Sequence, residues 1–409
     1  MRLGKPKTLK TFNRKIILDI LMESDAIKIS ELSKKTKLSK TTLMKILKHF
    51  LEKGLVVMDG KGKSTDEGGK KPNLYRFNPD AGYMFSVQVF PTELFSILTD
   101  LNSKPLLTLT EKIGEDEKID IIIEKITKTF KSLKNNNIDL DKIISIAIGS
   151  HGITDINKGT VITSPHFPSW GENLPFRDLL RKRIKKDIPI IIDNQIRFQA
   201  LAEKNNGGGK KKKNIIVIEG GEGLVAGIII NDSIKRGMHN LAGEVGHMVI
   251  NPDGKYVCAC GGRGCFEAMI SINRVIEIAR EGYNSEKDSL IFKEKKSRDI
   301  DIFDIFEASN KNDKFAQGLI DDVVRWFAIG FSNMVLMYDP EIIIIQGIYS
   351  KAGDYFLNRL KEKINEVSLL KSDKDVEIKY STCGKDAGVI GASFYLVSQF
   401  SKSIFEDAN

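Results

Sequence analysis

The chain has few of the residues that build disulfide-stapled or membrane-embedded proteins. Only 4 of its 409 residues are cysteine, and no stretch reaches the roughly 18 to 20 apolar residues that span a bilayer. The first residues, Met-Arg-Leu-Gly-Lys-Pro-Lys, are basic, but no apolar run follows them, so we expect no signal peptide. These absences argue against a membrane partner and favour the cytoplasm.

The few cysteines are not scattered. Three of the four lie with one of the five histidines in a stretch of nineteen residues: His247, Cys258, Cys260 and Cys265. In a chain without an export signal, such a cluster favours metal binding over a disulfide. Soft thiolates and one imidazole are the ligand set of a closed site, so we expect these four residues to hold a structural zinc ion. Cys383, in Ser-Thr-Cys-Gly, is better explained as a buried small residue.

Excess positive charge is confined to the start of the chain. Residues 1–77 hold 19 Lys and Arg residues against 8 Asp and Glu residues, a net charge of +11, whereas the remainder carries −2. Such asymmetry indicates a nucleic-acid-binding module joined to a near-neutral domain. The alternative, a solvated basic tail, is disfavoured because the segment is patterned: Ile16, Ile17, Ile20 and Leu21 recur at helical spacing.

Two further helices are predicted in this basic segment. One covers residues 30–37 with Ser30 as its N-cap, and the next covers residues 40–53, with Gly54 ending it. Two helices joined by a short turn, the second starting with polar and basic residues, are typical of a helix-turn-helix. Short strands at 55–57 and 73–77 then add a wing. We therefore predict a winged helix-turn-helix DNA-binding domain over residues 1–78.

The predicted DNA contacts lie at the exposed start of the third helix and in the wing. They are Ser39, Lys40, Thr41, Thr42 and Lys45 on the helix, facing base edges or phosphates, and Lys70 and Lys71 in the wing. The wing loop, 59–72, is rich in glycine and lysine, and its alternative interpretation is a loop that cradles a nucleotide phosphate. No strand-to-helix frame surrounds it, so that reading is disfavoured.

From about Gly82 onward, strands and helices alternate. Strands are predicted over residues 84–89, 95–100, 143–149, 189–193, 215–218, 224–230 and 341–346. Helices are predicted over residues 119–133, 272–281, 321–337 and from 304 onward. This pattern indicates an α/β protein, with two α/β lobes after the basic module.

Two linked motifs in this part resemble a known family. Gly243-Glu244-Val-Gly246-His247, followed by Cys258-x-Cys260-Gly261-x-x-Gly264-Cys265-x-Glu267, resembles the signature of the ROK family, which groups sugar-responsive repressors and sugar kinases. Weaker similarity lies in residues 164–170, 200–203 and 339–347. An N-terminal winged helix is what the repressor branch carries and the kinase branch lacks. The resemblance therefore extends over essentially the whole chain.

The resemblance implies an actin/hexokinase-like, ribonuclease H-like ROK domain with two lobes. The small α/β lobe is expected over residues 79–195, with a C-terminal helix at 388–409 returning to it. The large α/β lobe is expected over residues 196–387, with the zinc loop, the sugar site and a dimerisation surface. A homodimer or a dimer of dimers is the expected assembly.

The resemblance also implies a monosaccharide bound between the two lobes, with xylose or glucose favoured. The expected sugar contacts are Glu244, His247 and Glu267, with Asn194, the backbone near Gly152, and His166. Carboxylates accept hydrogen bonds from hydroxyls, and a metal-held loop fixes them in advance. One ring nitrogen of His247 would bind zinc and the other would face the sugar. Alternatively, the two glutamates are simply solvated, and His166 only packs under its loop.

Several positions that a ROK kinase needs are changed. The family's base aspartate lies eight residues before the glutamate of Ala200-Leu-Ala-Glu203, and Gln195 stands there, an amide that cannot act as a base. Asp193 lies two positions away, where its side chain is displaced. The phosphate loops are also altered: residues 86–92 lack glycine, Glu222 replaces a threonine, and Gln346 replaces a glycine. We therefore expect no enzyme activity and no catalytic residue.

The favoured hypothesis is a DNA-binding repressor of carbohydrate-utilisation genes whose operator binding is modulated by a monosaccharide. The alternative is an ATP-dependent sugar kinase that retains a DNA-binding arm. A third class is an adaptor that binds another protein, such as a sugar-transport component, without any role for sugar. The expected partners are operator DNA and a sugar effector, and structural zinc is the expected cofactor.

Overall fold

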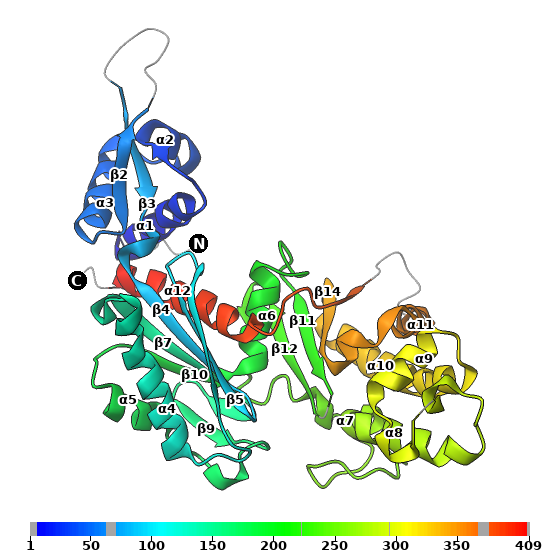
Figure 1. Cartoon of the computed structure of the whole chain (residues 1–409). Coiled ribbons are helices and arrows are strands. Elements are labelled where there is room, and N and C mark those ends of the chain that lie inside the picture. Colours follow the sequence, from blue (N-terminus) through cyan, green and yellow to red (C-terminus); the bar gives the residue numbers. More distant parts are fainter. Residues whose placement is uncertain (1–5, 63–70, 222, 294, 367–375, 407–409) are drawn as a thin grey trace. The chain divides into compact units, whose positions relative to one another are not determined.

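The structure, a computed structural model, describes residues 6–62, 71–221, 223–293, 295–366 and 376–406 (Figure 1). Lys70 and Glu222, which carry two of the predictions above, lie outside the described residues. The described residues form two compact units. The first comprises residues up to 151, 156–192 and those from 392 onward, and the second comprises residues 152–155 and 193–391. No described helix combines the length and the apolar character that crossing a membrane requires.

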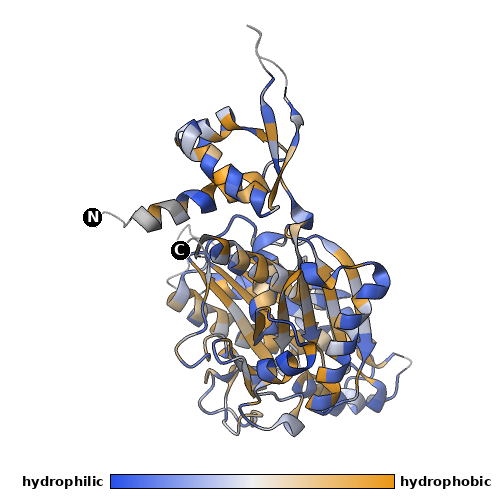
Figure 2. Cartoon of the chain, turned by 90° about the vertical axis from the view of Figure 1, so that its left-hand side faces the viewer, coloured by the Kyte–Doolittle hydropathy of each residue, from blue (hydrophilic) through white to orange (hydrophobic). Residues whose placement is uncertain are grey.

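The described residues up to Phe77 form a small domain of three helices and a three-stranded sheet in the order β1-β3-β2. The elements are α1 (Pro6–Met22), β1 (Ile27–Lys28), α2 (Ile29–Thr36), α3 (Lys40–Glu52), β2 (Val56–Lys61) and β3 (Asn73–Phe77). Leu32 of α2 and Leu43, Leu47 and Phe50 of α3 are buried together with Tyr75 and Phe77 of β3. Figure 2 shows hydrophobic and hydrophilic residues alternating around these helices.

Two details of this domain differ from the sequence predictions. Ser30 was predicted to cap the second helix, but α2 begins at Ile29 and its N-cap is Lys28. The reason is that Ile27 and Lys28 pair with β3 as a short strand, so the helix starts directly after that pairing. The second strand is also longer than predicted, because β2 pairs with β3 as far as Lys61 across an irregularity in register.

The rest of the first unit is built on a five-stranded mixed sheet in the order β10-β7-β4-β5-β6. Its strands are β4 (Tyr83–Val89), β5 (Glu93–Thr99), β6 (Pro105–Lys112), β7 (Ile143–Ser150) and β10 (Ile190–Asn194). The hairpin β8 (Ile153–Asp155) and β9 (Thr160–Thr163) follows β7. The helices are α4 (Ile119–Ser132), α5 (Phe176–Ile184) and α12 (Ala387–Glu406). α4 and α5 share one apolar core with the sheet, and Ser393 of α12 hydrogen-bonds to Thr99 of β5.

The second unit contains another five-stranded sheet, in the order β13-β12-β11-β14-β15. Its strands are β11 (Ile215–Gly220), β12 (Leu224–Ile230), β13 (Ser233–Ile234), β14 (Ile342–Gly347) and β15 (Glu377–Tyr380). Its helices are α6 (Gln195–Asn205), α7 (Phe266–Ile270), α8 (Ile272–Glu281), α9 (Ile302–Asn310), α10 (Lys314–Tyr338) and α11 (Gly353–Asn365). α6 shares a small apolar core with one face of this sheet, and α7–α11 share the main core with the other face. The isoleucine-rich strands β11 and β14 are therefore buried on both faces.

Candidate functional site

Helix α3 is held at its N-terminus by its own sequence. The Ser39 hydroxyl accepts a hydrogen bond from the Thr42 backbone N–H at 3.1 Å, which caps the helix. The Ser39 and Thr42 hydroxyls also lie 2.9 Å apart, within hydrogen-bond distance. Both residues were predicted to contact DNA. The structure shows their hydroxyls engaged with each other, so their first role is to start the helix.

The outward face of α3 is a stripe of exposed side chains, which we term the α3 stripe: Lys40, Thr41, Met44, Lys45 and Lys48. Lys40, Thr41 and Lys45 were predicted from the sequence, and all three are exposed. Met44 and Lys48 were missed, although they lie three residues after Thr41 and Lys45, respectively, and therefore on the same face. Lys71 in the wing is also exposed. The three lysines of this stripe can contact phosphates, and the apolar side chain between them can contact a base edge.

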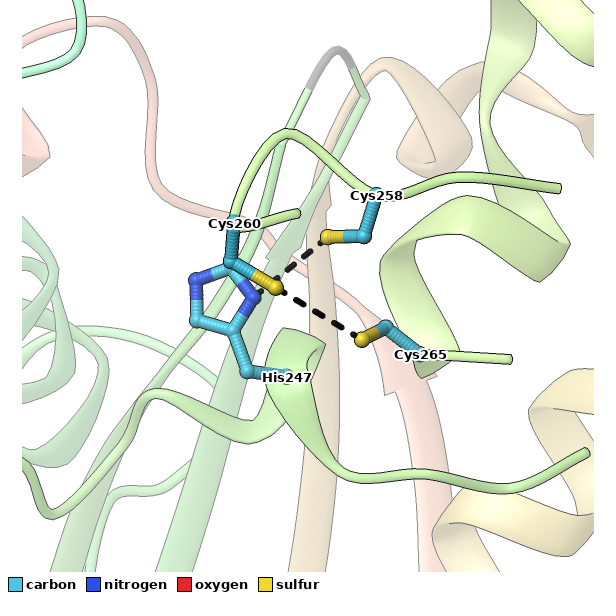
Figure 3. A group of neighbouring side chains, drawn as sticks. All are labelled: His247, Cys258, Cys260 and Cys265. Carbon is cyan, nitrogen blue, oxygen red and sulfur yellow. Dashed lines mark hydrogen bonds between the residues drawn. The ribbon is translucent and has the colours of Figure 1, made fainter. Parts of the chain in front are cut away.

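The four predicted metal ligands meet in the second unit. The ligand atoms of His247, Cys258, Cys260 and Cys265 all lie within 4.8 Å of one another (Figure 3). The sulfurs of Cys260 and Cys265 are 3.8 Å apart, and the sulfur of Cys258 is 3.6 Å from Nδ1 of His247.

The two shorter separations match those around a tetrahedral zinc ion, whereas wider ones, up to 4.8 Å, would have to shorten on binding. With Zn–S and Zn–N distances of about 2.3 and 2.1 Å, two sulfurs lie about 3.8 Å apart and a sulfur and a nitrogen about 3.6 Å. Burial raises the pKa of the Cys258 thiol to about 12, so a metal ion would have to displace its proton. Cys383 lies outside the cluster and is half-buried. Burial raises the pKa of its thiol, and the negative charge of Glu203 adds to that rise.

The backbone around the cysteines forms a tight loop. The Cys258 N–H donates to the Gly262 carbonyl at 2.8 Å, and the Gly261 N–H donates to the Cys258 carbonyl at 2.9 Å. Gly264 has a φ of +69°, and a Cβ there would lie 1.7 Å from the Asn251 carbonyl oxygen. Only glycine fits that position. The glycines of the motif therefore bring the cysteines together.

Glu267 and Glu244, the two predicted sugar-binding carboxylates, lie beside this cluster. One oxygen of Glu267 accepts the Leu224 backbone N–H at 2.9 Å, and the other lies 3.6 Å from the Cys258 sulfur. Glu244 is half-buried just before the short helix Val245–His247. Burial raises the pKa of Glu244, the negative charge of Glu267 adds to that rise, and His247 and Arg197 oppose it. The Glu267 carboxylate is thus fixed in orientation by backbone and sulfur contacts.

Asn194 and Gly152 are in direct contact. The Asn194 side chain donates to the Gly152 carbonyl at 2.7 Å, and its oxygen accepts the Ile196 N–H at 3.0 Å, which caps α6. In the first unit, the ring of His166 lies edge-on to that of His151, with centroids 4.6 Å apart. Burial, assisted by His166, lowers the pKa of His151 to about 3, so its imidazole is neutral.

The position of the kinase base is occupied by a buried amide. The Gln195 side chain is almost fully buried and donates to the Glu219 carboxylate at 3.4 Å. Burial raises the pKa of Glu219 to about 6, while hydrogen bonds from Gln195 and Gln199 oppose that rise. The Gln195 amide is thus engaged with the half-buried Glu219 carboxylate. Both oxygens of Asp193 are bound by arginines, so this residue does not present a free base either.

Comparison with known proteins agrees with this arrangement. The profile of the ROK family matches residues 87–399, and that of a winged helix-turn-helix DNA-binding domain matches residues 13–57. The chain belongs to the ROK family. A solved ROK family transcriptional regulator, a homologue of the E. coli Mlc protein, covers 97% of this chain and 98% of its own, with a TM-score of 0.82 and 24% identity. The predicted fold class, a winged helix-turn-helix followed by an actin/hexokinase-like ROK domain, is confirmed.

Two sequence relatives represent the two branches of the ROK family. The xylose repressor of Caldicellulosiruptor bescii is 28% identical over 97% of this chain and 98% of its own length. The glucokinase of Thermotoga maritima is 32% identical over 70% of this chain and 86% of its own. The repressor matches almost the whole chain, whereas the glucokinase matches a shorter part of it.

Proposed function

We propose that this protein is a transcriptional repressor of carbohydrate-utilisation genes whose affinity for operator DNA is changed by a bound monosaccharide. One observation carries the proposal: the chain joins a helix with an exposed basic face to a ROK domain in which Gln195 fills the base position. Such a chain can read DNA and bind a sugar but lacks the base for phosphoryl transfer. We place it in the cytoplasm, where its operator lies.

The α3 stripe is the proposed DNA-reading surface. Lys40, Lys45 and Lys48 would contact phosphates, while Thr41 and Met44 would meet base edges in the major groove. Lys70 and Lys71 of the wing would contact the neighbouring backbone. We propose a homodimer, or a dimer of dimers, because two identical half-sites one helical turn apart bind a symmetric pair of such helices.

The loop around the cysteine cluster is the proposed sugar-binding region. The sugar hydroxyls would donate hydrogen bonds to the carboxylates of Glu244 and Glu267 and would also contact His247. Asn194, the Gly152 backbone and His166 would complete the contacts. A zinc ion on His247, Cys258, Cys260 and Cys265 would fix the loop without taking part in chemistry. D-xylose is the first candidate and D-glucose the second, since repressors and glucokinases are both among the relatives.

A sugar kinase is the second candidate, favoured by the 32% identity with the Thermotoga glucokinase. Three features weigh against it. Gln195 cannot accept a proton, Asp193 is bound by two arginines, and the stretch Val89-Phe90-Pro91 supplies no glycine for a phosphate loop. An ATP-coupled assay with a sugar panel separates the two candidates: steady turnover by the wild type would favour the kinase.

The repressor proposal is tested by gel-shift titration of the full-length protein with its own upstream DNA. The titration is repeated with D-xylose, D-glucose and N-acetylglucosamine at millimolar concentration. We expect binding to the upstream fragment but not to a scrambled one, and a change of at least several-fold with one sugar. Binding that no sugar alters would refute sugar control, and absence of specific binding would refute the repressor itself.

A further inference from the structure

Asp193 lies at the end of β10, completely buried, and its carboxylate is held by two arginines. One oxygen accepts a hydrogen bond from Nη1 of Arg197 at 2.8 Å, and the other accepts two from Arg236, at 2.9 and 2.6 Å. The first oxygen also accepts the Asn194 backbone N–H at 2.8 Å. We term Asp193, Arg197 and Arg236 the arginine clamp. Its Asp193 and Arg197 side chains are at most 2% exposed, and Arg236 is 20% exposed.

The arginine clamp joins segments that are far apart in the sequence. Asp193 is the last residue but one of β10, Arg197 lies in the first turn of α6, and Arg236 is the second residue of the loop 235–244 that leads to Glu244. A buried carboxylate is tolerated only when it is paired and hydrogen-bonded, and two guanidinium groups meet that need. Loss of one partner would leave a charge buried without full compensation. The clamp therefore fixes where the loop begins.

Arg197 also holds the far end of the same loop. Its Nη2 donates to the Asn240 carbonyl at 2.6 Å, so one guanidinium contacts both the Asp193 carboxylate and the loop backbone. Three backbone hydrogen bonds complete the attachment: Ala242 N–H to the Arg236 carbonyl, Ala226 N–H to the Gly243 carbonyl, and Glu244 N–H to the Leu241 carbonyl. Glu244 is the last residue of this loop. Burial raises the pKa of its carboxyl group, and the charge of Arg197 opposes that rise.

Apolar packing contributes little to the position of this loop. Its two large apolar side chains, Met238 and Leu241, are 93% and 52% exposed. A loop without a buried apolar anchor depends on its polar contacts for a defined conformation. These contacts converge on the arginine clamp at one end and on His247 of the cysteine cluster at the other.

We propose that the arginine clamp positions Glu244 for the sugar, so that Asp193 and Arg236 set sugar affinity without touching the ligand. The proposal rests on the proposed sugar-binding role of Glu244. It makes Asp193 a positioning residue, in place of the kinase-like base that its location two residues before Gln195 would otherwise indicate. Displacing a polar contact by about 1 Å costs a large part of its binding energy, so we expect sugar affinity to fall roughly tenfold when the clamp is broken.

The test compares three variants of the full-length protein. Arg236→Met removes one of the two guanidinium groups that bind Asp193 and leaves the Asp193–Arg197 ion pair, whose net charge is zero. Arg236→Lys keeps the positive charge at position 236. Lys204→Met is the matched control, because Lys204 lies on α6, the helix that carries Arg197, and its ion pair is with Asp232, outside the arginine clamp. Hydrogen exchange of the peptide covering residues 235–247 is measured without sugar, and calorimetry with D-xylose and D-glucose gives the affinity.

We expect faster exchange of residues 235–247 and roughly tenfold weaker sugar binding for Arg236→Met, partial recovery for Arg236→Lys, and no change for Lys204→Met. Zinc content should be equal in all three. Wild-type exchange and affinity in Arg236→Met would overturn the proposal, as would equal losses in Lys204→Met. If neither sugar binds the wild type, the proposed function fails for these sugars, and exchange alone still decides whether the clamp positions the loop.

Discussion

Helix α3 and the loop that carries Glu244 both present exposed polar side chains, but different contacts hold them in place. α3 is shaped by residues within or next to it: Ser39 caps it, and Leu43, Leu47 and Phe50 bury one of its faces. The Glu244 loop buries no large apolar side chain and is tied to Asp193, Ala226 and the cysteine cluster. Because α3 depends on local contacts and the Glu244 loop on distant ones, a substitution that disrupts one of them should leave the other intact.

The largest expected effect comes from removing a metal ligand. Cys258→Ser should abolish zinc binding and with it the sugar response, because structural zinc contributes on the order of 10 kcal/mol to the segment that it orders. Operator binding without sugar should be unchanged, since α3 does not depend on that loop. Zinc content by mass spectrometry, sugar calorimetry and gel shifts measure the three quantities.

Cys383→Ser provides the control for this substitution, because Cys383 lies outside the cluster. It should keep full zinc content and sugar affinity. If Cys258→Ser still bound stoichiometric zinc, the four-ligand site would be wrong. If it lost operator binding as well as zinc, the two regions would not be independent.

The converse substitution disrupts the buried face of α3 and leaves the cysteine cluster unchanged. Leu47 is 1% exposed, and Leu47→Ala should destabilise the N-terminal domain by about 2–5 kcal/mol through lost burial and the cavity left behind. We expect operator affinity to fall while sugar affinity and zinc content stay at wild-type values. Calorimetric unfolding should show one transition shifted and the other unmoved. Leu336→Ala, at a 55% exposed position, is the control and should change neither transition.

The same contrast explains what could be predicted from the sequence. The positions of α3 and of the four candidate metal ligands follow from short motifs: a cap, an apolar spacing of three and four, and cysteines close together. Arg236 could not be predicted, because its role depends on Asp193, 43 residues away, and nothing in its own neighbourhood signals a partner. The same holds for Leu224, whose N–H fixes Glu267, and for Glu219, whose contact with Gln195 requires β11 and α6 to be placed first.

Ser39→Ala tests how far local contacts alone hold α3. Loss of the N-cap should cost about 1 kcal/mol of stability in the N-terminal domain. Thermal unfolding of the wild type and the variant measures it. Ser30→Ala is the matched control: the sequence suggested a cap there, but the structure places Ser30 inside α2, so the substitution should have little effect. A larger loss from Ser30→Ala than from Ser39→Ala would contradict the assigned caps.

The smallest expected effect comes from Met44→Ala, which tests whether α3 contacts a base. Met44 is 49% exposed in the middle of the α3 stripe, between lysines that we propose contact phosphates, which carry no sequence information. If its side chain meets a thymine methyl group, Met44→Ala should weaken operator binding by about 1 kcal/mol. Replacing that thymine with uracil should weaken wild-type binding equally and leave the variant unaffected. Lys48→Ala, the comparison, should weaken operator and scrambled DNA alike and reduce the salt dependence. Equal losses for Met44→Ala on thymine and uracil operators would instead assign Met44 to a protein contact.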